Sequence, residues 1–417
     1  MRARSVVAAL LFASAAGCQF GALRENLRTL DQNGFLRGTV TVPGQETGPL
    51  VVFAVPAAAN ATAAADWTVL GRQGPYFLVV PVGPYRVGAF EDGNHNLAYD
   101  ADERGGWVQG GVPITVRPAG ITGGLNLALG ATPPVPPIAV TLPARGTSDI
   151  EALPASRVGE VTTLDDPRFS PESARIGLWR PVEFLVDVGA GIYFLEPYDP
   201  TRTPVLFVHG ALGDPTNFRT LIATLDRTRY QAWVAYYPSA ARLDVAGAAL
   251  GRWLQALEAA YHFPRLGLVA HSMGGLVARA YLNGDRAGLG GALEALAFVT
   301  IATPWQGHES AALGVQRAPV VVPAWFDLAP GSPFLGALLA VPPPRYATFD
   351  LYFAYGGRQR RGPPNDGVVT IASQLERRAQ DQARHVFGFD AQHLAVLADP
   401  AVGEQLQRSL ASVAPRS

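Results

Sequence analysis

The alternation of apolar and polar residues follows one period before residue 130 and another after residue 200. In the first part, from about Gly38 to Leu129, short apolar stretches alternate with polar residues and are separated by turn residues. This spacing predicts the strands of a small antiparallel β-sandwich over residues 38–130. The stretches that carry the prediction are 38–42, 50–55, 76–80, 85–90 and 112–116.

From Thr203 onward, short continuous apolar runs, which are typical of buried strands, alternate with segments whose apolar residues recur at helical spacing. Residues 244–261 place apolar side chains near helical spacing. The runs that predict strands are 204–208, 230–237, 266–269, 296–301 and 350–355. This order is typical of an α/β fold, a mostly parallel sheet with helices on both faces, over residues 201–417.

The N-terminus has the pattern of a processing signal over residues 1–17. Arg2 and Arg4 precede the short apolar stretch 6–13, which is too short to span a bilayer. Small residues then lead to Cys18, as in a bacterial lipoprotein box, although Ala15 stands where that pattern usually has Leu. We predict a lipid anchor at Cys18 and a place in the cell envelope. The alternative is an ordinary signal peptide and a secreted protein.

Two segments are expected to connect these parts. Residues 18–37 are interpreted as a tether. Residues 131–200 are interpreted as a Pro-rich connector followed by lead-in strands at 177–181 and 191–195. No second apolar stretch is long enough to be a convincing transmembrane helix.

The composition of the chain argues against two classes of protein, those that bind nucleic acid and those held together by disulfides. The net charge is −1 and charged residues make up 16% of the chain, which argues against nucleic acid as a partner. Cys18 is the only cysteine, so an internal disulfide framework is excluded.

Ser272 lies between an apolar strand pattern and a helical run, in the sequence Ala270-His271-Ser272-Met273-Gly274. Small residues two before and two after a serine permit the sharp turn of a nucleophile elbow. The Met273 N–H would then lie at a helix N-terminus, where it can stabilise an oxyanion. A second donor is expected from the Ala211 N–H, because Gly210 lets that loop approach the substrate.

A serine nucleophile needs a histidine base and an acid, in the chain order Ser, Asp, His for this fold. We predict His393 as the base and Asp366 as the acid. His385 is the alternative base, but its sequence predicts the start of a last strand, and His308 follows the elbow too closely. His209 precedes the serine and is expected to pack its loop. For the acid, Asp350 and then Asp327 are the alternatives.

These segments resemble α/β-hydrolases of the bacterial lipase and esterase type over residues 200–410. The matching motifs are Val208-His209-Gly210-Ala211-Leu212-Gly213, Ala270 to Gly275, Ala302-Thr303-Pro304-Trp305-Gln306-Gly307, Leu328 to Leu335 and Asp366-Gly367-Val368-Val369. The resemblance implies that residues 308–345 form a lid or pocket wall. The region around residues 74–87 loosely resembles prealbumin-like or carboxypeptidase-regulatory-like domains, which implies no activity.

The sequence therefore predicts a serine hydrolase that cleaves acyl or lipid esters through an acyl-enzyme, with no cofactor required. An acyltransferase or thioesterase would use the same triad. The alternative of another class is a surface-binding lipoprotein whose hydrolase domain has no catalytic activity. The intact order of Ser272, Asp366 and His393 argues against this alternative.

One further motif lies in the predicted sandwich. Oxygen-bearing side chains occur at EF-hand-like spacing, but Leu97 stands where such a loop needs Gly, and no flanking helices are evident. The motif is read as a polar hairpin or, alternatively, as a structural Ca²⁺ site. The ligands would be Asp92, Asn94, Asn96, Asp100 and Glu103.

Overall fold

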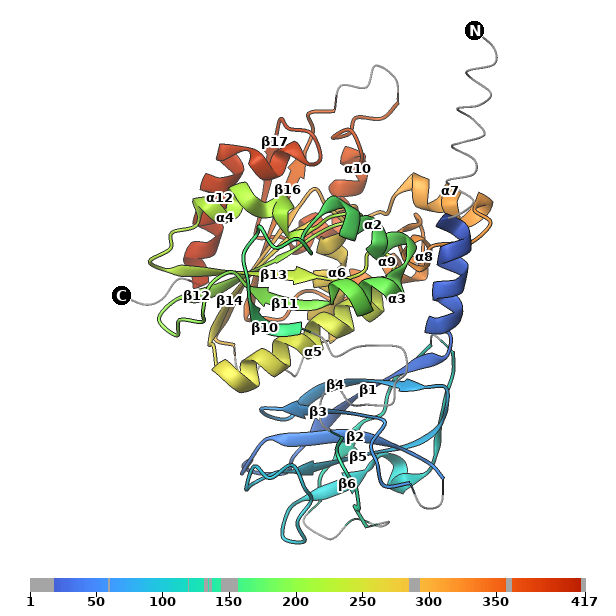
Figure 1. The fold of residues 1–417 in the computed structure, drawn as a ribbon. Coiled ribbons are helices and arrows are strands. Elements are labelled where there is room, and N and C mark those ends of the chain that lie inside the picture. Colours follow the sequence, from blue (N-terminus) through green and yellow to red (C-terminus); the bar gives the residue numbers. More distant parts are fainter. Residues whose placement is uncertain are drawn as a thin grey trace.

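The computed structural model describes residues 19–58, 61–118, 120–130, 134, 137–143, 157–284, 293–357 and 362–413. Cys18 and the signal pattern before it lie outside these ranges. Within them the chain forms an N-terminal helix, a β-sandwich and an α/β domain (Figure 1). No described helix combines the length and the apolarity that crossing a membrane requires.

Two sheets form the sandwich. One has the order β4-β1-β8, with β9 also paired to β1, and the other has the order β3-β2-β5-β6, with β7 also paired to β5. Apolar side chains that alternate along the strands meet between the sheets and form one core. The strands are β1 (Asn33–Thr41), β2 (Leu50–Pro56), β3 (Asp66–Leu70), β4 (Gly74–Pro81), β5 (Gly83–Glu91), β6 (Gly105–Trp107), β7 (Ile114–Val116), β8 (Ile121–Thr122) and β9 (Leu127–Ala128).

An eight-stranded sheet forms the centre of the α/β domain, in the order β10-β11-β13-β12-β14-β15-β16-β17. From β13 to β17 all neighbours are parallel, whereas β11 runs antiparallel to β13. The strands are β10 (Arg157–Val161), β11 (Gly191–Phe194), β12 (Thr203–Val208), β13 (Tyr230–Tyr236), β14 (Arg265–His271), β15 (Ala295–Ile301), β16 (Ala347–Ala354) and β17 (His385–Phe389). The predicted architecture, a mostly parallel α/β sheet with helices on both faces after a β-sandwich, is confirmed.

Helices cover both faces of this sheet (Figure 1). They are α2 (Pro171–Trp179), α3 (Pro181–Glu183), α4 (Arg219–Thr224), α5 (Leu243–Tyr261), α6 (Met273–Gly284), α7 (Glu309–Arg317), α8 (Pro323–Leu328), α9 (Pro333–Leu338), α10 (Ile371–Gln374), α11 (Arg377–Gln382) and α12 (Pro400–Leu410). Strands β12 to β16 are buried along almost their whole length, because helices cover them on both sides.

The prediction that residues 18–37 form a tether is wrong. Residues 19–30 form a helix, and β1 begins at Asn33 rather than at 38. Leu23 is completely buried in the core of the α/β domain, and the Val182 N–H donates to Asn26 Oδ1 at 2.9 Å. Apolar side chains at helical spacing therefore fix this segment against the α/β domain.

Of the two predicted lead-in strands, the one at 191–195 is confirmed as β11, and the other is wrong. Residues 177–181, expected as a strand, lie at the end of α2 and the start of α3. Ser170 caps α2 and Pro171 occupies its first turn, a helix-start signal that outweighs the apolar run. Strands β10 and β11 belong to the eight-stranded sheet, and α2 is one of the helices that cover it. The α/β domain therefore begins near residue 157 and not at residue 201.

The two domains contact each other through α5. The Arg252 guanidinium donates to both carboxylate oxygens of Asp66 at 2.8 and 3.0 Å. The Gln255 amide donates to the Pro75 carbonyl at 2.8 Å, and Arg72 pairs with Glu258 at 3.4 Å. The sandwich thus rests on the outer side of α5 through polar contacts.

Candidate active site

Ser272 occupies the turn between β14 and α6. Its φ of 54° is left-handed, a conformation that few non-glycine residues adopt and that marks a strained turn. The Ser272 N–H donates to the Ile301 carbonyl at 2.8 Å, which holds the turn against β15. Gly274 is required here, because a side chain at this position would collide with the Val208 and His209 carbonyls. The hydroxyl is therefore presented at the carboxyl end of the sheet.

The structure brings together the three residues that the sequence indicated for the triad. His393 Nε2 lies 2.9 Å from Ser272 Oγ, and His393 Nδ1 lies 2.6 Å from Asp366 Oδ2. Since a carboxylate accepts, Nδ1 carries the proton and Nε2 is left to accept from the serine hydroxyl. The three side chains come from the ends of three parallel strands, β14, β16 and β17, which explains how residues 121 apart in sequence meet.

Asp366 is fully buried and its carboxylate is satisfied on both oxygens. The Val368 and Val369 N–H groups donate to Oδ1 at 2.9 and 2.7 Å, and the Gln374 amide donates to Oδ2 at 3.1 Å. Four donors, counting His393, offset the cost of burying this charge. The carboxylate is therefore held in place to orient the imidazole.

Sequence reasoning assigned no role to Gln374. Its amide also donates to the Ala354 and Val369 carbonyls, and its oxygen accepts from the Ala354 N–H at 2.8 Å. Gln374 thus ties α10 to the end of β16 and to the acid loop. A single Gln in a short helix gives no sequence signal for such a role.

His271 is a second residue for which the sequence predicted no function. Its Nε2–H donates to the backbone carbonyl of His393 at 2.9 Å. Complete burial lowers the pKa of His271 to about 3, so the ring is neutral and can donate through one nitrogen only. Its place directly before the nucleophile was the available signal.

Ala211 and Met273 lie where two oxyanion donors are needed. Met273 is the first residue of α6, and Ala211 lies in the loop that begins with His209 after β12. A Cβ on Gly210 would come within 2.7 Å of the Ser272 Cβ, so this backbone lies directly against the nucleophile. In the described part of the chain, neither the Ala211 N–H nor the Met273 N–H has a hydrogen-bond partner. Both are available to a substrate oxygen.

The structure places the alternative residues elsewhere. His385 Nδ1 contacts Asp350 at 3.2 Å at the β16–β17 edge, where Arg384 and Ser409 also bind that carboxylate. The Asp327 carboxylate accepts hydrogen bonds from the Arg242 guanidinium and from the Leu243 N–H.

His209 packs its own loop. The ring stacks on Tyr237 and donates to the Gly210 carbonyl at 2.8 Å, and burial lowers its pKa to about 4. His308 caps α7. None of these groups contacts Ser272 among the described residues.

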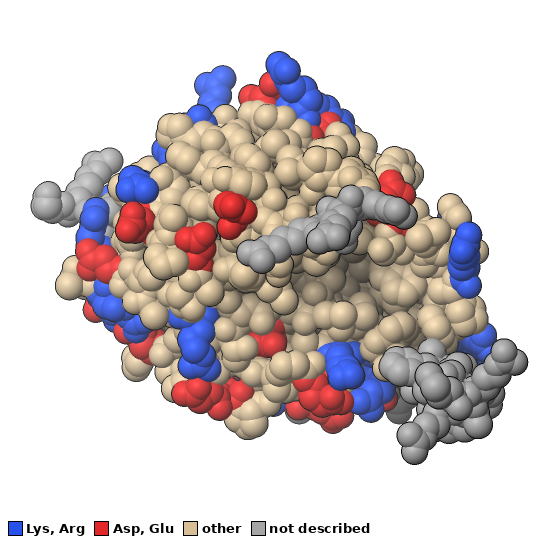
Figure 2. Space-filling model, turned by 90° about the horizontal axis from the view of Figure 1, so that it is seen from above, with Lys and Arg blue, Asp and Glu red and all other residues tan. Residues whose placement is uncertain are grey.

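Segment 308–345 forms α7, α8 and α9, and His308, which precedes α7, contacts the Val368 carbonyl beside Asp366 at 2.9 Å. Several apolar side chains near the triad remain exposed: Leu212 after the oxyanion loop, Val368 after Asp366 and Leu394 after His393. Seen from above in Figure 2, the surface around a central hollow is mostly uncharged, and most charged side chains lie nearer the outline.

The proposed calcium ligands form a hydrogen-bonded loop. Both Asp92 oxygens accept backbone N–H groups, from Asn96 and Leu97, and Glu103 accepts from Gly93 and Asp100. The amides of Asn94 and Asn96 donate to Asp100. Among the described residues, no group of three or more His, Cys, Asp or Glu side chains is placed to hold a metal ion. These contacts are those of a polar hairpin, and the Ca²⁺ site stays a prediction.

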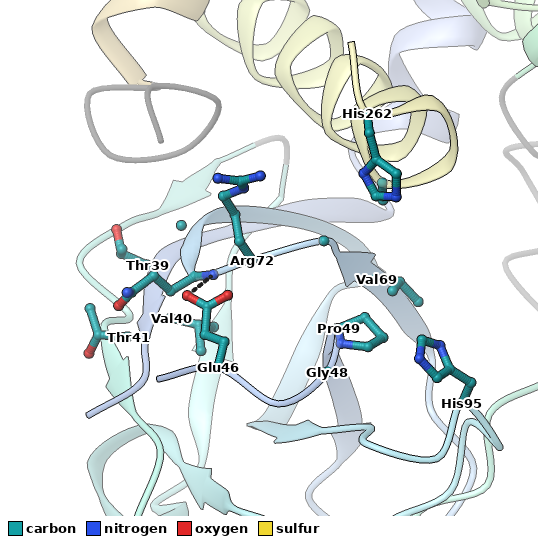
Figure 3. Close-up of a pocket in the computed structure, with 14 residues that line it drawn as sticks. Thr39, Val40, Thr41, Glu46, Gly48, Pro49, Val69, Arg72, His95 and His262 are labelled. Carbon is teal, nitrogen blue, oxygen red and sulfur yellow. Dashed lines mark hydrogen bonds between the residues drawn. The ribbon is translucent and has the colours of Figure 1, made fainter. Parts of the chain in front are cut away.

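A separate cleft of about 800 Å³ lies between the sandwich and the end of α5 (Figure 3). Arg72, His95 and His262 line it, and Glu46 lies on its floor, where its carboxylate accepts the Gln73 N–H at 3.1 Å. No residue of the triad or of the oxyanion loop lines this cleft.

Residues 205–326 match the family model described as "Putative serine esterase (DUF676)". No curated protein matches. Among solved structures, the chain is similar to the mature lipase BlEst2 of Bacillus licheniformis, with 18% identity, a TM-score of 0.40, and 52% of this chain and 97% of that chain covered.

Two further structures illustrate the range of the similarity. The lin2722 gene product of Listeria innocua has 16% identity and a TM-score of 0.38, with 50% of this chain and 94% of that chain covered. Lipase B of Aspergillus fumigatus has 14% identity and a TM-score of 0.38, with 56% and 58% covered. The match to the serine esterase model over residues 205–326 supports ester hydrolysis.

Proposed function

We propose that this protein is a serine hydrolase that cleaves carboxylic esters with apolar acyl groups. The observation that carries the proposal is the line of contacts from Ser272 Oγ through His393 to the buried Asp366. The exposed apolar side chains Leu212, Val368 and Leu394 beside this line favour an apolar substrate over a charged one.

In the proposed reaction, Ser272 Oγ attacks the ester carbonyl while His393 Nε2 takes the hydroxyl proton. Asp366 stabilises the imidazolium that forms. The Ala211 and Met273 N–H groups stabilise the tetrahedral oxyanion, and loss of one such donor typically costs about 100- to 1,000-fold in rate. His393 then protonates the leaving alcohol, and water attacks the acyl-enzyme with His393 again as base. No step uses a metal or a cofactor.

We also propose that Cys18 is lipidated and holds the enzyme in the cell envelope. The basis is the sequence pattern alone: small residues before the only cysteine of the chain.

Covalent labelling with a fluorophosphonate probe tests the nucleophile. The wild-type protein should be labelled on Ser272, and Ser272→Ala should abolish both labelling and ester hydrolysis. His393→Ala should lower kcat by about 10,000-fold or more, since triad members act as a unit. His385→Ala is the matched control, because this histidine also contacts an aspartate but has no contact with Ser272 among the described residues. An unlabelled wild-type protein, or loss of activity in His385→Ala alone, would contradict the proposal.

A further inference from the structure

The eight-stranded sheet ends in β10 on one side and in β17 on the other, and the two edge strands are built differently. The pairing of β10 with β11 shifts between Val158 and Glu160, where Gly159 has a φ of 80°. Arg157 and Glu160 also place an ion pair of 3.0 Å on this edge. Bulges and charges of this kind keep an exposed strand edge from pairing with another chain.

The opposite edge strand, β17, has neither feature. Its five residues pair with β16 in an unbroken parallel register and include no Asp, Glu, Lys or Arg. In the described part of the chain, β16 is its only sheet partner. The Tyr355 N–H donates to the Phe389 carbonyl at 3.0 Å, so Phe389 bonds toward β16. Because alternate residues of a strand bond to the same side, Val386 and Gly388 turn their N–H and C=O groups away from β16.

The side chains at this edge are apolar. Val386 is 39% exposed, and Tyr355 at the end of β16 is 43% exposed. The Phe353 ring lies over Gly388, where an added Cβ would come within 2.5 Å of it. The rings of Phe353 and Tyr355 are 5.9 Å apart. An apolar strand edge whose backbone groups point outward is a template for another strand.

We propose that two copies of this chain pair through β17, antiparallel and about a two-fold axis at Phe387. This register brings Val386 of each copy opposite Gly388 of the other, and these are the residues whose N–H and C=O groups point outward. The Val386 side chain of one copy then packs on the Phe353 ring that lies over Gly388 of the second copy. The edge is therefore complementary to itself in backbone and in side chains.

The charged residues that flank β17 favour the same register. Arg384 lies three residues before Phe387, and Asp390 lies three residues after it. A two-fold axis at Phe387 therefore places Arg384 of each copy opposite Asp390 of the other. Arg384 binds Asp350 through Nε and Nη2, and it can donate from Nη1 as well. An axis one residue earlier or later would keep the backbone bonds but separate these charges. The partner selected by this edge is thus a second copy of the chain.

The pairing would join two eight-stranded sheets into one. Because the paired strands run antiparallel, the carboxyl ends of the two sheets face opposite directions. The two triads lie at these ends, so each would open on its own side of the dimer. No triad residue belongs to β17, and the inference does not depend on the proposed ester chemistry.

Thiol cross-linking tests the register. In a full chain carrying Cys18→Ser, which removes the only native cysteine, Phe387→Cys places two thiols face to face at the axis. Such a pair has Cα atoms about 4.5 Å apart, within the range of a disulfide. Mild oxidation should convert most of this variant to a covalent dimer.

Two valines supply matched controls for the cross-link. Val386→Cys lies on the same strand, but the axis puts its two copies two residues out of register. Val161→Cys lies on β10, the other edge of the sheet, and Val161 is 51% exposed. Neither control should cross-link at a comparable rate. A control that cross-links as fast as Phe387→Cys, or a Phe387→Cys variant that stays uncoupled, overturns the proposal.

Sedimentation equilibrium tests the association itself. The full chain with Cys18→Ser should reach twice the mass of one chain at high micromolar concentration. Asp390→Arg should raise the dissociation constant about tenfold or more, because it places arginines opposite each other. Asp165→Arg is the matched control, since Asp165 is an exposed acid of the same domain away from β17, and it should leave the constant within about twofold.

A backbone substitution completes the test. Val386→Pro removes one outward N–H without removing a bond to β16, so it should leave a folded monomer. Asp390 is exposed and lies outside the strand, so Asp390→Arg decides the question even where Val386→Pro fails to fold. A chain that stays monomeric without these substitutions, or a dimer that Asp390→Arg leaves unchanged, overturns the proposal.

Discussion

His393 is held at three points besides its contact with the serine. Its ring Nδ1 meets Asp366, its backbone N–H donates to the Asp366 carbonyl at 2.9 Å, and its own carbonyl accepts from His271. Main chain and side chain are therefore fixed by different partners. Such preorganisation keeps the base within reach of the serine without a conformational search.

This arrangement makes His271 a positioning residue with a measurable effect. His271→Phe should lower kcat about tenfold with little change in KM, because a small displacement of a catalytic base is costly while substrate contacts persist. His271→Gln, whose amide can still donate, should recover part of the loss. The steady-state constants and the pH profile of both variants check this. A KM effect without a kcat effect would assign His271 to substrate binding instead.

The two buried histidines predict how stability depends on pH. Burial lowers the pKa of His209 to about 4 and that of His271 to about 3, whereas an unfolded histidine titrates near 6.5. Between these values only the unfolded state takes up the protons, so stability falls as the pH falls below about 6.5. Each residue should cost about 2 kcal/mol between pH 7 and pH 5.

Urea unfolding at both pH values measures this loss. His209→Phe should show a pH-dependent loss smaller by about 2 kcal/mol than the wild type, whatever its stability at pH 7. His262→Phe is the control, because that histidine is largely exposed at the end of α5. An unchanged pH dependence in His209→Phe would mean that the His209 ring takes up a proton in the folded protein as readily as in the unfolded chain.

At the scale of elements, the tight junction of α6 with the β12 loop sets the geometry of the nucleophile. Gly274 and Gly284 lie near the two ends of α6, the first tightly packed against backbone and the second in open space. A Cβ on Gly274 would overlap two backbone carbonyls, whereas one on Gly284 would meet nothing within 4 Å.

Gly274→Ala should therefore cost about 1–3 kcal/mol through overpacking and should greatly reduce labelling of Ser272, since the elbow must shift. Gly284→Ala should leave activity unchanged and alter stability by less than about 1 kcal/mol. Thermal unfolding and fluorophosphonate labelling of the two variants make the comparison. Normal labelling of Gly274→Ala would show that the elbow can move without loss.

The sequence allowed the parallel sheet and the triad to be predicted because each catalytic residue lies in a connection that follows a strand: Ser272 after β14, Asp366 after β16 and His393 after β17. The motif around Ser272 and the position of His393 after the last apolar run needed no tertiary information. The first helix was missed because its apolar side chains, Leu23 among them, find their partners only in distant parts of the chain. The role of Gln374 likewise depends on contacts that no local pattern specifies.

For the whole molecule, the contact of the sandwich with α5 predicts how the domains unfold. Arg252 donates to both oxygens of Asp66, and both side chains are partly shielded from water. Arg252→Met should weaken this contact by about 1 kcal/mol, a modest value because surface ion pairs are screened. Calorimetry should then resolve two transitions or a broader one. Arg265→Met, which breaks a pair within the α/β domain, is the control.

A double-mutant cycle with Asp66→Asn separates the pair from other effects of the substitutions. If the two substitutions are additive, the ion pair does not couple the domains.

The helix of residues 19–30 determines where a recombinant chain can start. Because Leu23 completes the interior of the α/β domain, a chain that begins at the sandwich would expose a gap in the hydrolase although it removes no catalytic residue. The same holds for a tag inserted between this helix and β1, which would separate two segments only two residues apart. Expression of an intact enzyme thus depends on a segment more than 240 residues before its nucleophile.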